Sequence, residues 1–256
     1  MNVLILGGTT EASAIAAALA GNKRVRPVLS LAGRTRAPVL PPVPARRGGF
    51  GGVDGLAAYL RAQGVAALID ATHPFAARIS RNARAAAQIA GVPMVAVSRP
   101  PWIAGPGDRW TEAADMPAAA QALGAAPRRV FLTVGQQELA PFRLAPWHHY
   151  LIRSIEPPDP ALLPPAARCI AARGPFREDA ERALLEREGI EVIVTKNSGG
   201  TATAPKLAAA QALGIPVVMV ARPNIAFSGP PGETVPDAVG ALAWLDHVAA
   251  PWERGV

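Results

Sequence analysis

The feature that most restricts the fold of this sequence is a regular alternation of apolar, β-branched segments with helix-forming ones. In the first hundred residues the strand-like segments are "NVLILGG", "VRPVLSLAG", "VAALIDAT" and "VPMVAVSRP". Alanine-rich segments with the composition of helices separate them. Strands that alternate with helices are typical of parallel βαβ units. The pattern therefore predicts an α/β protein built on parallel sheets.

A second series of the same kind follows the Pro- and Gly-rich stretch "RPPWIAGPGDRW". Its apolar segments are "RRVFLTVGQQ", "HHYLIRSIEP", "ARCIAARGPF", "IEVIVTKNSGG" and "IPVVMVARP". We therefore predict two Rossmann-like domains, residues 1–100 and 126–256, whose parallel sheets face a shared cleft. Residues 101–125 are expected to form a linker region. A chain of 256 residues that is 50% hydrophobic is large enough for two such cores.

The composition argues against several functional classes. No apolar run approaches the roughly 20 residues needed to cross a bilayer, and the start "MNVLILGG" has no basic signal-peptide region. We therefore expect a cytoplasmic protein without a membrane partner. The only cysteine, Cys169, excludes an internal disulfide and a cysteine metal cluster. Its apolar surroundings predict a buried, structural role.

The net charge of +7 comes mainly from scattered arginines, with no basic block and no aromatic-interleaved motif. We therefore expect no nucleic-acid partner. A polyanionic small molecule is the ligand class that this charge favours. Part of the arginine excess is equally explained by a GC-rich genome, so the charge serves only as support.

The first strand is followed by a glycine and threonine loop, Gly7-Gly8-Thr9-Thr10. In open α/β sheets, ligands bind outside the carboxyl ends of the strands. The loop lacks the G-x-G-x-x-G spacing, although backbone N–H groups and hydroxyls before a helix can hold a phosphate. Gly8, Thr9 and Thr10 are therefore candidate cofactor contacts.

The second strand ends in "LAGRTR", where NAD enzymes usually carry an acidic residue for the ribose. Arginine at this place suits a 2′-phosphate, so Arg34 predicts NADP over NAD if a dinucleotide binds. The alternative is that Arg34 and Arg36 are exposed loop residues.

A polar loop in "VTKNSGGTATAPKLAAA" links a strand-like segment to a helix-like one. Backbone N–H groups in such a turn form a concave donor surface for an anion. Ser198, Gly199, Gly200 and Thr201 are the predicted donors, with positive charge from Lys196 and Lys206. The alternatives are an ordinary turn in which Ser or Thr caps the helix, and a solvated helix lysine at position 206.

The segment "DATHPFA" also follows a strand and contains Asp70 and His73. His73 fits general acid–base chemistry, contact with a ligand carboxylate, or capping of the next helix. We find no metal-binding spacing, nucleophile elbow or Walker loop in the sequence. The chemistry is therefore expected to come from a bound cofactor, or to be absent.

In order along residues 1–223, several motifs together resemble the precorrin-6A reductase family of cobalamin biosynthesis. They are "ILGGTTEA", "LAGRT", "GGFGG", "DATHPFA", "FLTVGQQEL" and "TKNSGGTATAPKLAAAQALGIPVVMVARP". The resemblance implies NADPH-dependent reduction of one C=C bond of precorrin-6A to dihydroprecorrin-6 (precorrin-6B). It also implies two Rossmann-like domains around a cleft, and no metal.

The resemblance assigns roles to matching residues. It implies one cofactor contact at Gly8, Thr9 and Thr10 and a second at residues 198–201, without deciding which loop holds the pyrophosphate. The tetrapyrrole substrate carries many carboxylates, and we expect His73, Arg99 and Lys196 to contact it. The proton that accompanies the hydride comes from solvent or from Asp70.

One departure from the family pattern is Gln136-Gln137, where basic residues are expected, and it argues against a substrate carboxylate at that loop. Two other functions stay open: a nucleotide-binding two-domain transferase and a non-redox binding module. Titration with NADPH separates both from a reductase.

Overall fold

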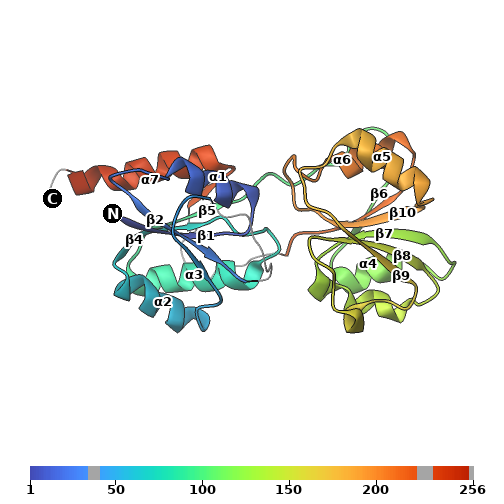
Figure 1. Cartoon of the computed structure of the whole chain (residues 1–256), viewed down its shortest axis with the longest axis horizontal. Coiled ribbons are helices and arrows are strands. Elements are labelled where there is room, and N and C mark those ends of the chain that lie inside the picture. Colours follow the sequence, from blue (N-terminus) through green and yellow to red (C-terminus); the bar gives the residue numbers. More distant parts are fainter. Residues whose placement is uncertain (34–40, 224–232, 254–256) are drawn as a thin grey trace. The chain divides into compact units, whose positions relative to one another are not determined.

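The chain forms two compact α/β units in the computed structural model, which describes residues 1–33, 41–223 and 233–253. The first unit contains Met1–Arg99 and Asn224–Val256, and the second contains Pro100–Pro223. Each unit has a six-stranded sheet, and all strand pairs in the described residues are parallel (Figure 1). The prediction of two Rossmann-like domains with parallel sheets is confirmed.

The first sheet has the strand order of dinucleotide-binding folds. Its order is β3-β2-β1-β4-β5-β12, which is the 3-2-1-4-5-6 arrangement with β12 in sixth place. The order reverses between β1 and β4, so the loops after these two strands flank the switch point. The strands are β1 (Asn2–Leu6), β2 (Arg26–Leu31), β3 (Ala45–Arg47), β4 (Val65–Asp70), β5 (Met94–Val97) and β12 (Glu233–Val235).

Helices cover both faces of the first sheet (Figure 1). Ile5 of β1 packs in a buried cluster with Trp244 on one face. Its neighbour Leu4 packs with Leu56 on the other face. Burial on both faces explains why the strands are continuous apolar runs in the sequence. The helices are α1 (Thr10–Ala18) and α7 (Ala238–Glu253) on one face, and α2 (Gly52–Ala62) and α3 (Ala77–Ala90) on the other.

The second sheet repeats this arrangement. Counted from β7, its order β9-β8-β7-β10-β11-β6 is again 3-2-1-4-5-6, with β6 in sixth place and the switch point between β7 and β10. The strands are β6 (Trp110–Ala113), β7 (Arg129–Thr133), β8 (His149–Ser154), β9 (Ala167–Ala171), β10 (Val192–Lys196) and β11 (Val217–Val220). The α-helices are α4 (Met116–Ala122), α5 (Glu178–Arg187) and α6 (Pro205–Ala212). No helix in the described residues of either unit is long and apolar enough to cross a membrane.

The domain bounds differ from the predicted ones at both ends. Part of the expected linker 101–125 forms β6 and α4, and β6 pairs with β11 of the second sheet. The end of the expected second domain forms β12 and α7, and β12 pairs with β5 of the first sheet. The sixth strand of each sheet is short and lies at a sheet edge, and β12 is also far along the chain from the other five strands of its sheet. Such strands carry little sequence signal of their own.

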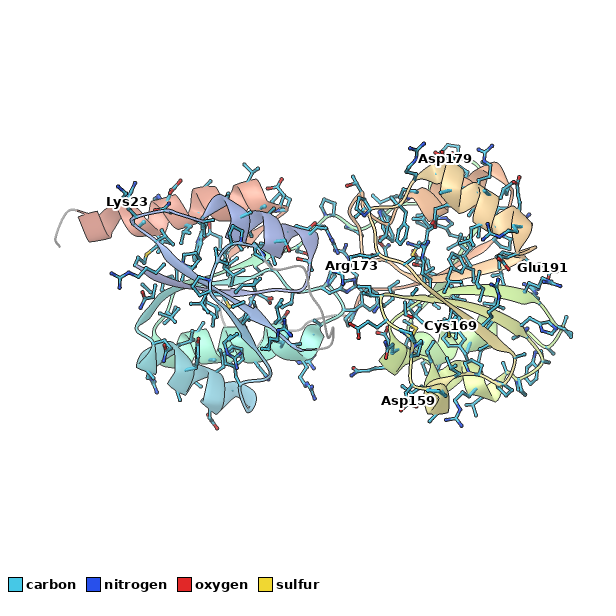
Figure 2. The ribbon with its side chains drawn as sticks, viewed as in Figure 1. Lys23, Asp159, Cys169, Arg173, Asp179 and Glu191 are labelled. Atoms are coloured by element: carbon cyan, nitrogen blue, oxygen red, sulfur yellow. The ribbon has the colours of Figure 1, made fainter. Side chains whose placement is uncertain are left out.

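Cys169 is only half-buried in β9, not buried as predicted (Figure 2). It occupies a strand at the edge of the second sheet, which leaves one side without a neighbouring strand. Partial burial still raises the pKa of the Cys169 thiol. The thiol form is therefore favoured over the reactive thiolate.

Candidate functional site

Most of the predicted site residues lie at the two switch points, one in each sheet. In the first unit, residues 8–10 lie between the end of β1 and the first residue of α1, and residues 70–73 begin at the last residue of β4. In the second unit, the loops after β7 and β10 carry residues 135–138 and 197–201. Parallel strands bring their carboxyl ends to one edge, so the loops in each pair are neighbours.

The two glycines after β1 have different roles. A Cβ on Gly7 would lie 2.6 Å from Cδ1 of Leu29, so any larger residue here would force the Leu29 side chain of β2 to shift. Gly8 has φ +115°, a conformation that favours glycine, and nothing lies within 4 Å of the position its Cβ would take. Gly8 therefore leaves open space next to the amino terminus of α1, where the helix dipole favours an anion.

The hydroxyl of Thr9 is used within the protein. Its Oγ1 accepts a hydrogen bond from the Ala12 N–H at 3.1 Å as the N-cap of α1. The same oxygen donates to the Ala71 carbonyl at 2.7 Å, which joins the loops after β1 and β4 across the switch point. Oγ1 of Thr10 donates to Oε2 of Glu11 at 3.1 Å. We therefore assign the Thr9 hydroxyl a structural role.

Asp70 and His73 shape the loop after β4. The Asp70 side chain is buried, and its Oδ1 accepts hydrogen bonds from the Thr72 N–H at 3.1 Å and the Thr72 hydroxyl at 2.7 Å. Nδ1 of His73 accepts from the Phe75 N–H at 3.2 Å, so the neutral ring carries its proton on Nε2. The N-cap of α3 is Ala76, without a side-chain cap hydrogen bond, so the alternative that His73 caps the next helix is wrong. The His73 ring instead contacts the backbone just before that cap.

The predicted substrate cations Arg99 and Lys196 are both held by glutamates. Nη1 of Arg99 lies 3.1 Å from Oε2 of Glu11, and Nζ of Lys196 lies 2.8 Å from Oε2 of Glu138. Exposure of these four side chains is between 14% and 28%. Oε2 of Glu138 also accepts from the Gly135 N–H at 2.8 Å, so this pair joins the loops after β7 and β10. The glutamates orient the two cations and partly neutralise them.

The loop of residues 197–204 connects β10 to α6, as the sequence predicted. Gly199 and Gly200 have φ values of +65° and +80°. A Cβ on Gly199 would lie 2.2 Å from the Pro100 carbonyl oxygen, so this glycine permits close approach of two backbone segments. Ser198 is 9% exposed, and Thr201 is exposed. The N-cap of α6 is Ala204, which contradicts the alternative that Ser or Thr caps the helix.

Lys206 is 3% exposed, which contradicts the alternative of a solvated helix lysine. Its Nζ donates to the Thr203 carbonyl at 2.7 Å and lies 4.8 Å from the ring centroid of Trp102. Burial, together with the positive charge of Arg153, lowers its pKa to about 7, and Glu181 partly opposes this. The ammonium group thus lies inside the second unit and is not presented at its surface.

Comparison with known proteins identifies the family. The sequence profile described as precorrin-6x reductase CbiJ/CobK matches residues 2–246. The chain belongs to this family. The predicted precorrin reductase of cobalamin biosynthesis is thereby confirmed at the level of the family.

Individual members of the CbiJ/CobK family are similar over nearly the whole chain. The precorrin-6A reductase of Rhodobacter capsulatus is 49% identical over 99% of both proteins. The precorrin-6A reductase of Rhodococcus erythropolis is 51% identical over 95% of this chain and 96% of its own. A solved structure of CobK precorrin-6A reductase is 47% identical and covers 96% of both chains with a TM-score of 0.89. The cobalt-precorrin-6A reductase of Priestia megaterium is 31% identical over 72% of this chain.

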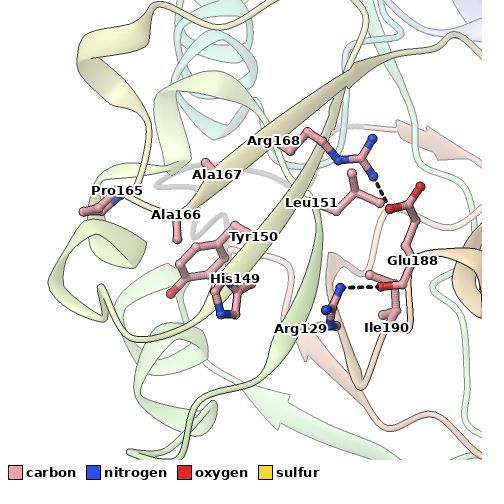
Figure 3. Close-up of a pocket in the computed structure, with 10 residues that line it drawn as sticks. All are labelled: Arg129, His149, Tyr150, Leu151, Pro165, Ala166, Ala167, Arg168, Glu188 and Ile190. Carbon is pink, nitrogen blue, oxygen red and sulfur yellow. Dashed lines mark hydrogen bonds and ion pairs between the residues drawn. The ribbon is translucent and has the colours of Figure 1, made fainter.

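A cavity of about 300 Å³ in this CbiJ/CobK-family chain lies away from the predicted residues (Figure 3). It opens at the starts of β7, β8 and β9, the amino edge of the second sheet, whereas the switch-point loops lie at the carboxyl edge. Arg168 pairs with the Glu188 carboxylate beside it, and Nη1 of Arg129 donates to the Glu188 carbonyl at 3.4 Å. We therefore do not include this cavity in the candidate site.

Sequence reasoning missed several residues that support the candidate site of this family member. Glu11 is in the first turn of α1, next to a predicted site loop, and Glu138 follows Gln136-Gln137, but nothing in the sequence pairs them with Arg99 and Lys196. Trp102 contacts the 197–204 loop and had been placed in the expected linker. Arg34 and Arg36, the predicted 2′-phosphate contacts, lie outside the described residues.

Proposed function

We propose that this chain is an NADPH-dependent precorrin-6A reductase that forms dihydroprecorrin-6 (precorrin-6B). The observation that carries the proposal is the full-length similarity to proteins named precorrin-6A reductase, at 49% identity over 99% of the chain. The relative named for a cobalt-containing substrate is 31% identical. This difference supports the metal-free precorrin as the substrate.

The bound cofactor would supply a hydride to one C=C bond of the macrocycle. The residues at the first switch point fit a dinucleotide: Gly8 leaves open space, and the amino terminus of α1 adds positive potential. We assign the pyrophosphate to this loop, because the space beside Gly199 is filled by Pro100. Thr10, Arg34 and the 198–201 loop are proposed as further cofactor contacts.

The substrate would be held through its carboxylates. Arg99 and Lys196 have fixed directions because Glu11 and Glu138 hold them, and both keep some exposure to solvent. A carboxylate that approaches either cation therefore meets an oriented donor. His73, beside the first switch point, is the third proposed contact.

Solvent is the proposed source of the proton that accompanies the hydride. Asp70 is 4% exposed, and its Oδ1 accepts two hydrogen bonds from Thr72. This arrangement supports a structural role for Asp70.

The first test is fluorescence titration of the parent protein with NADPH and NADH, followed by NADPH consumption with precorrin-6A. We expect tighter binding of NADPH and turnover only with the macrocycle present. Equal use of the two nucleotides would refute the 2′-phosphate contact. Absence of NADPH binding would refute the reductase and leave the transferase or the binding module.

The Gly8→Ala variant tests the position of the pyrophosphate. The new methyl group would enter the proposed phosphate space, so we expect NADPH affinity to fall at least about tenfold. Gly21→Ala is the matched control, because Gly21 also has positive φ (+73°) and open space but follows α1 at its other end. Parent-like NADPH affinity in a folded Gly8→Ala protein would contradict the assignment.

A further inference from the structure

Trp102 is joined to the 197–204 loop by three hydrogen bonds. Its backbone N–H donates to Oδ1 of Asn197 at 2.8 Å, and Nδ2 of Asn197 donates back to the Trp102 carbonyl at 2.9 Å. Its indole Nε1 donates to the Gly200 carbonyl at 3.0 Å. The side chain of Asn197 thus fixes the tryptophan backbone, and the indole fixes the next part of the loop.

The bond to Gly200 determines the direction of a donor. In a planar trans peptide, the C=O and the N–H of the following residue point in opposite directions. Because the indole holds the Gly200 carbonyl, the Thr201 N–H points away from the indole. Gly199 is held at the same time, since the Pro100 carbonyl approaches it so closely that a Cβ would lie 2.2 Å away.

The indole ring also lies against the buried side-chain amine of Lys206. Nζ of Lys206 lies 4.8 Å from the ring centroid and donates to the Thr203 carbonyl at 2.7 Å. In its protonated form, a desolvated amine over an indole face makes a favourable contact. Nε of Arg222 donates to the Asn197 carbonyl at 2.8 Å. The loop is therefore fixed near its start, in its middle and near its end.

We propose that Trp102 is a positioning residue, which orients the backbone donors of residues 199–201 toward the cofactor without touching the cofactor itself. The inference rests on the proposed function, in which this loop contacts NADPH. It adds a residue that none of the motifs contained.

The test compares Trp102→Phe with Trp147→Phe. Nε1 of Trp147 also donates to a glycine carbonyl, that of Gly124, at 3.1 Å in the same unit but away from the loop. Phenylalanine keeps an aromatic ring but removes the N–H donor together with part of the indole ring, and the Trp147→Phe control has the same loss of ring size. Hydrogen exchange of peptides that cover residues 197–204 and β10 is measured without ligand, and NADPH affinity is measured separately.

For Trp102→Phe we expect faster exchange in residues 197–204, unchanged exchange in β10 and about five- to tenfold weaker NADPH binding, the loss of one hydrogen bond. Trp147→Phe should match the parent in the exchange of residues 197–204, the exchange of β10 and NADPH affinity. Parent-like loop exchange or parent-like NADPH affinity in Trp102→Phe overturns the inference. If the parent itself binds no NADPH, the proposed function fails, whereas the exchange result still reports on the loop.

A second variant keeps the inference testable if Trp102→Phe does not fold. Asn197→Asp retains the oxygen that accepts from the Trp102 N–H and loses the Nδ2 donor. We expect faster exchange than in the parent, confined to the same loop. Unchanged exchange in Asn197→Asp would overturn the inference independently.

Discussion

At the scale of single residues, the second unit buries two cations close to one carboxylate. Arg153, Lys206 and Glu181 are 8%, 3% and 3% exposed. Nη1 of Arg153 pairs with Oε1 of Glu181 at 2.5 Å, and its guanidinium lies 3.8 Å from the ring centroid of Phe176. Burial therefore disfavours the protonated form of Lys206, and the attraction of the Glu181 carboxylate only partly offsets this desolvation.

This arrangement predicts a pH dependence of stability. The pKa of Lys206 is about 7 in the folded protein, against an ordinary value of 10.5. Between these values the unfolded chain binds the proton and the folded chain does not. The free energy of unfolding should therefore rise with pH, by at most about 1.4 kcal/mol per pH unit from this group. Below pH 7 both states are protonated, so the contribution is constant.

The Lys206→Met variant removes this titration. Urea unfolding of the second unit, measured from about pH 6 to about pH 9, should show the parent gaining stability relative to the variant above pH 7. Lys23→Met is the control, because Lys23 is an exposed lysine of the first unit (Figure 2). If the parent and Lys206→Met curves run parallel, Lys206 does not carry the effect.

At the scale of elements, α7 completes the first unit although it ends the described chain. Leu245 and Trp244 are 1% and 7% exposed and belong to the same buried cluster as Ile5 of β1. The helix therefore covers the face of the first sheet that also carries α1. Substitutions of its buried residues should therefore lower the unfolding free energy of the first unit.

The Leu245→Ala variant tests this assignment. Removal of a fully buried leucine side chain should lower the unfolding free energy of the first unit by about 2–5 kcal/mol. Val239→Ala, in the same helix at a residue that is 74% exposed, should change it by less than about 0.5 kcal/mol. Denaturant unfolding followed by peptide-level hydrogen exchange distinguishes the units. A loss confined to the second unit would support the predicted bounds instead.

Elements differ in how well the sequence predicted them. Strands buried on both faces, such as β1 and β10, were recognisable as apolar runs, and the glycines and polar residues that follow them indicated the site loops. β6 and β12 were missed because each has only three or four residues in an edge position. The burial of Lys206 and its contact with Trp102 depend on segments about a hundred residues apart, which periodicity does not detect. The family was recognised because several of its motifs occur in the expected order along the sequence.

At the scale of the whole molecule, the two units differ in whether they are built from one continuous segment of the chain or from two. The second unit is continuous, from Pro100 to Pro223. The first is discontinuous, because its sixth strand and last helix follow the entire second unit. The second unit can therefore fold from one continuous segment, whereas the first needs two segments that are far apart in the sequence.

This difference predicts how stably fragments of the chain fold. A fragment of residues 100–223 should show α/β circular dichroism and a cooperative thermal transition, because its sheet has all six strands. A fragment of residues 1–99 should unfold at lower temperature than a fusion in which residues 233–256 are rejoined to it through a flexible linker. Equal melting of the short fragment and the fusion would contradict the role of β12 and α7.

The late position of β12 also has a consequence for synthesis on the ribosome. β5 emerges with one edge of its sheet open, and that edge stays open while more than a hundred further residues are translated. The second unit has β6 from its beginning and has all its strands before translation ends. The unit whose synthesis begins first therefore completes its sheet last. Throughout that interval the nascent chain carries an unpaired strand edge, and such edges promote aggregation.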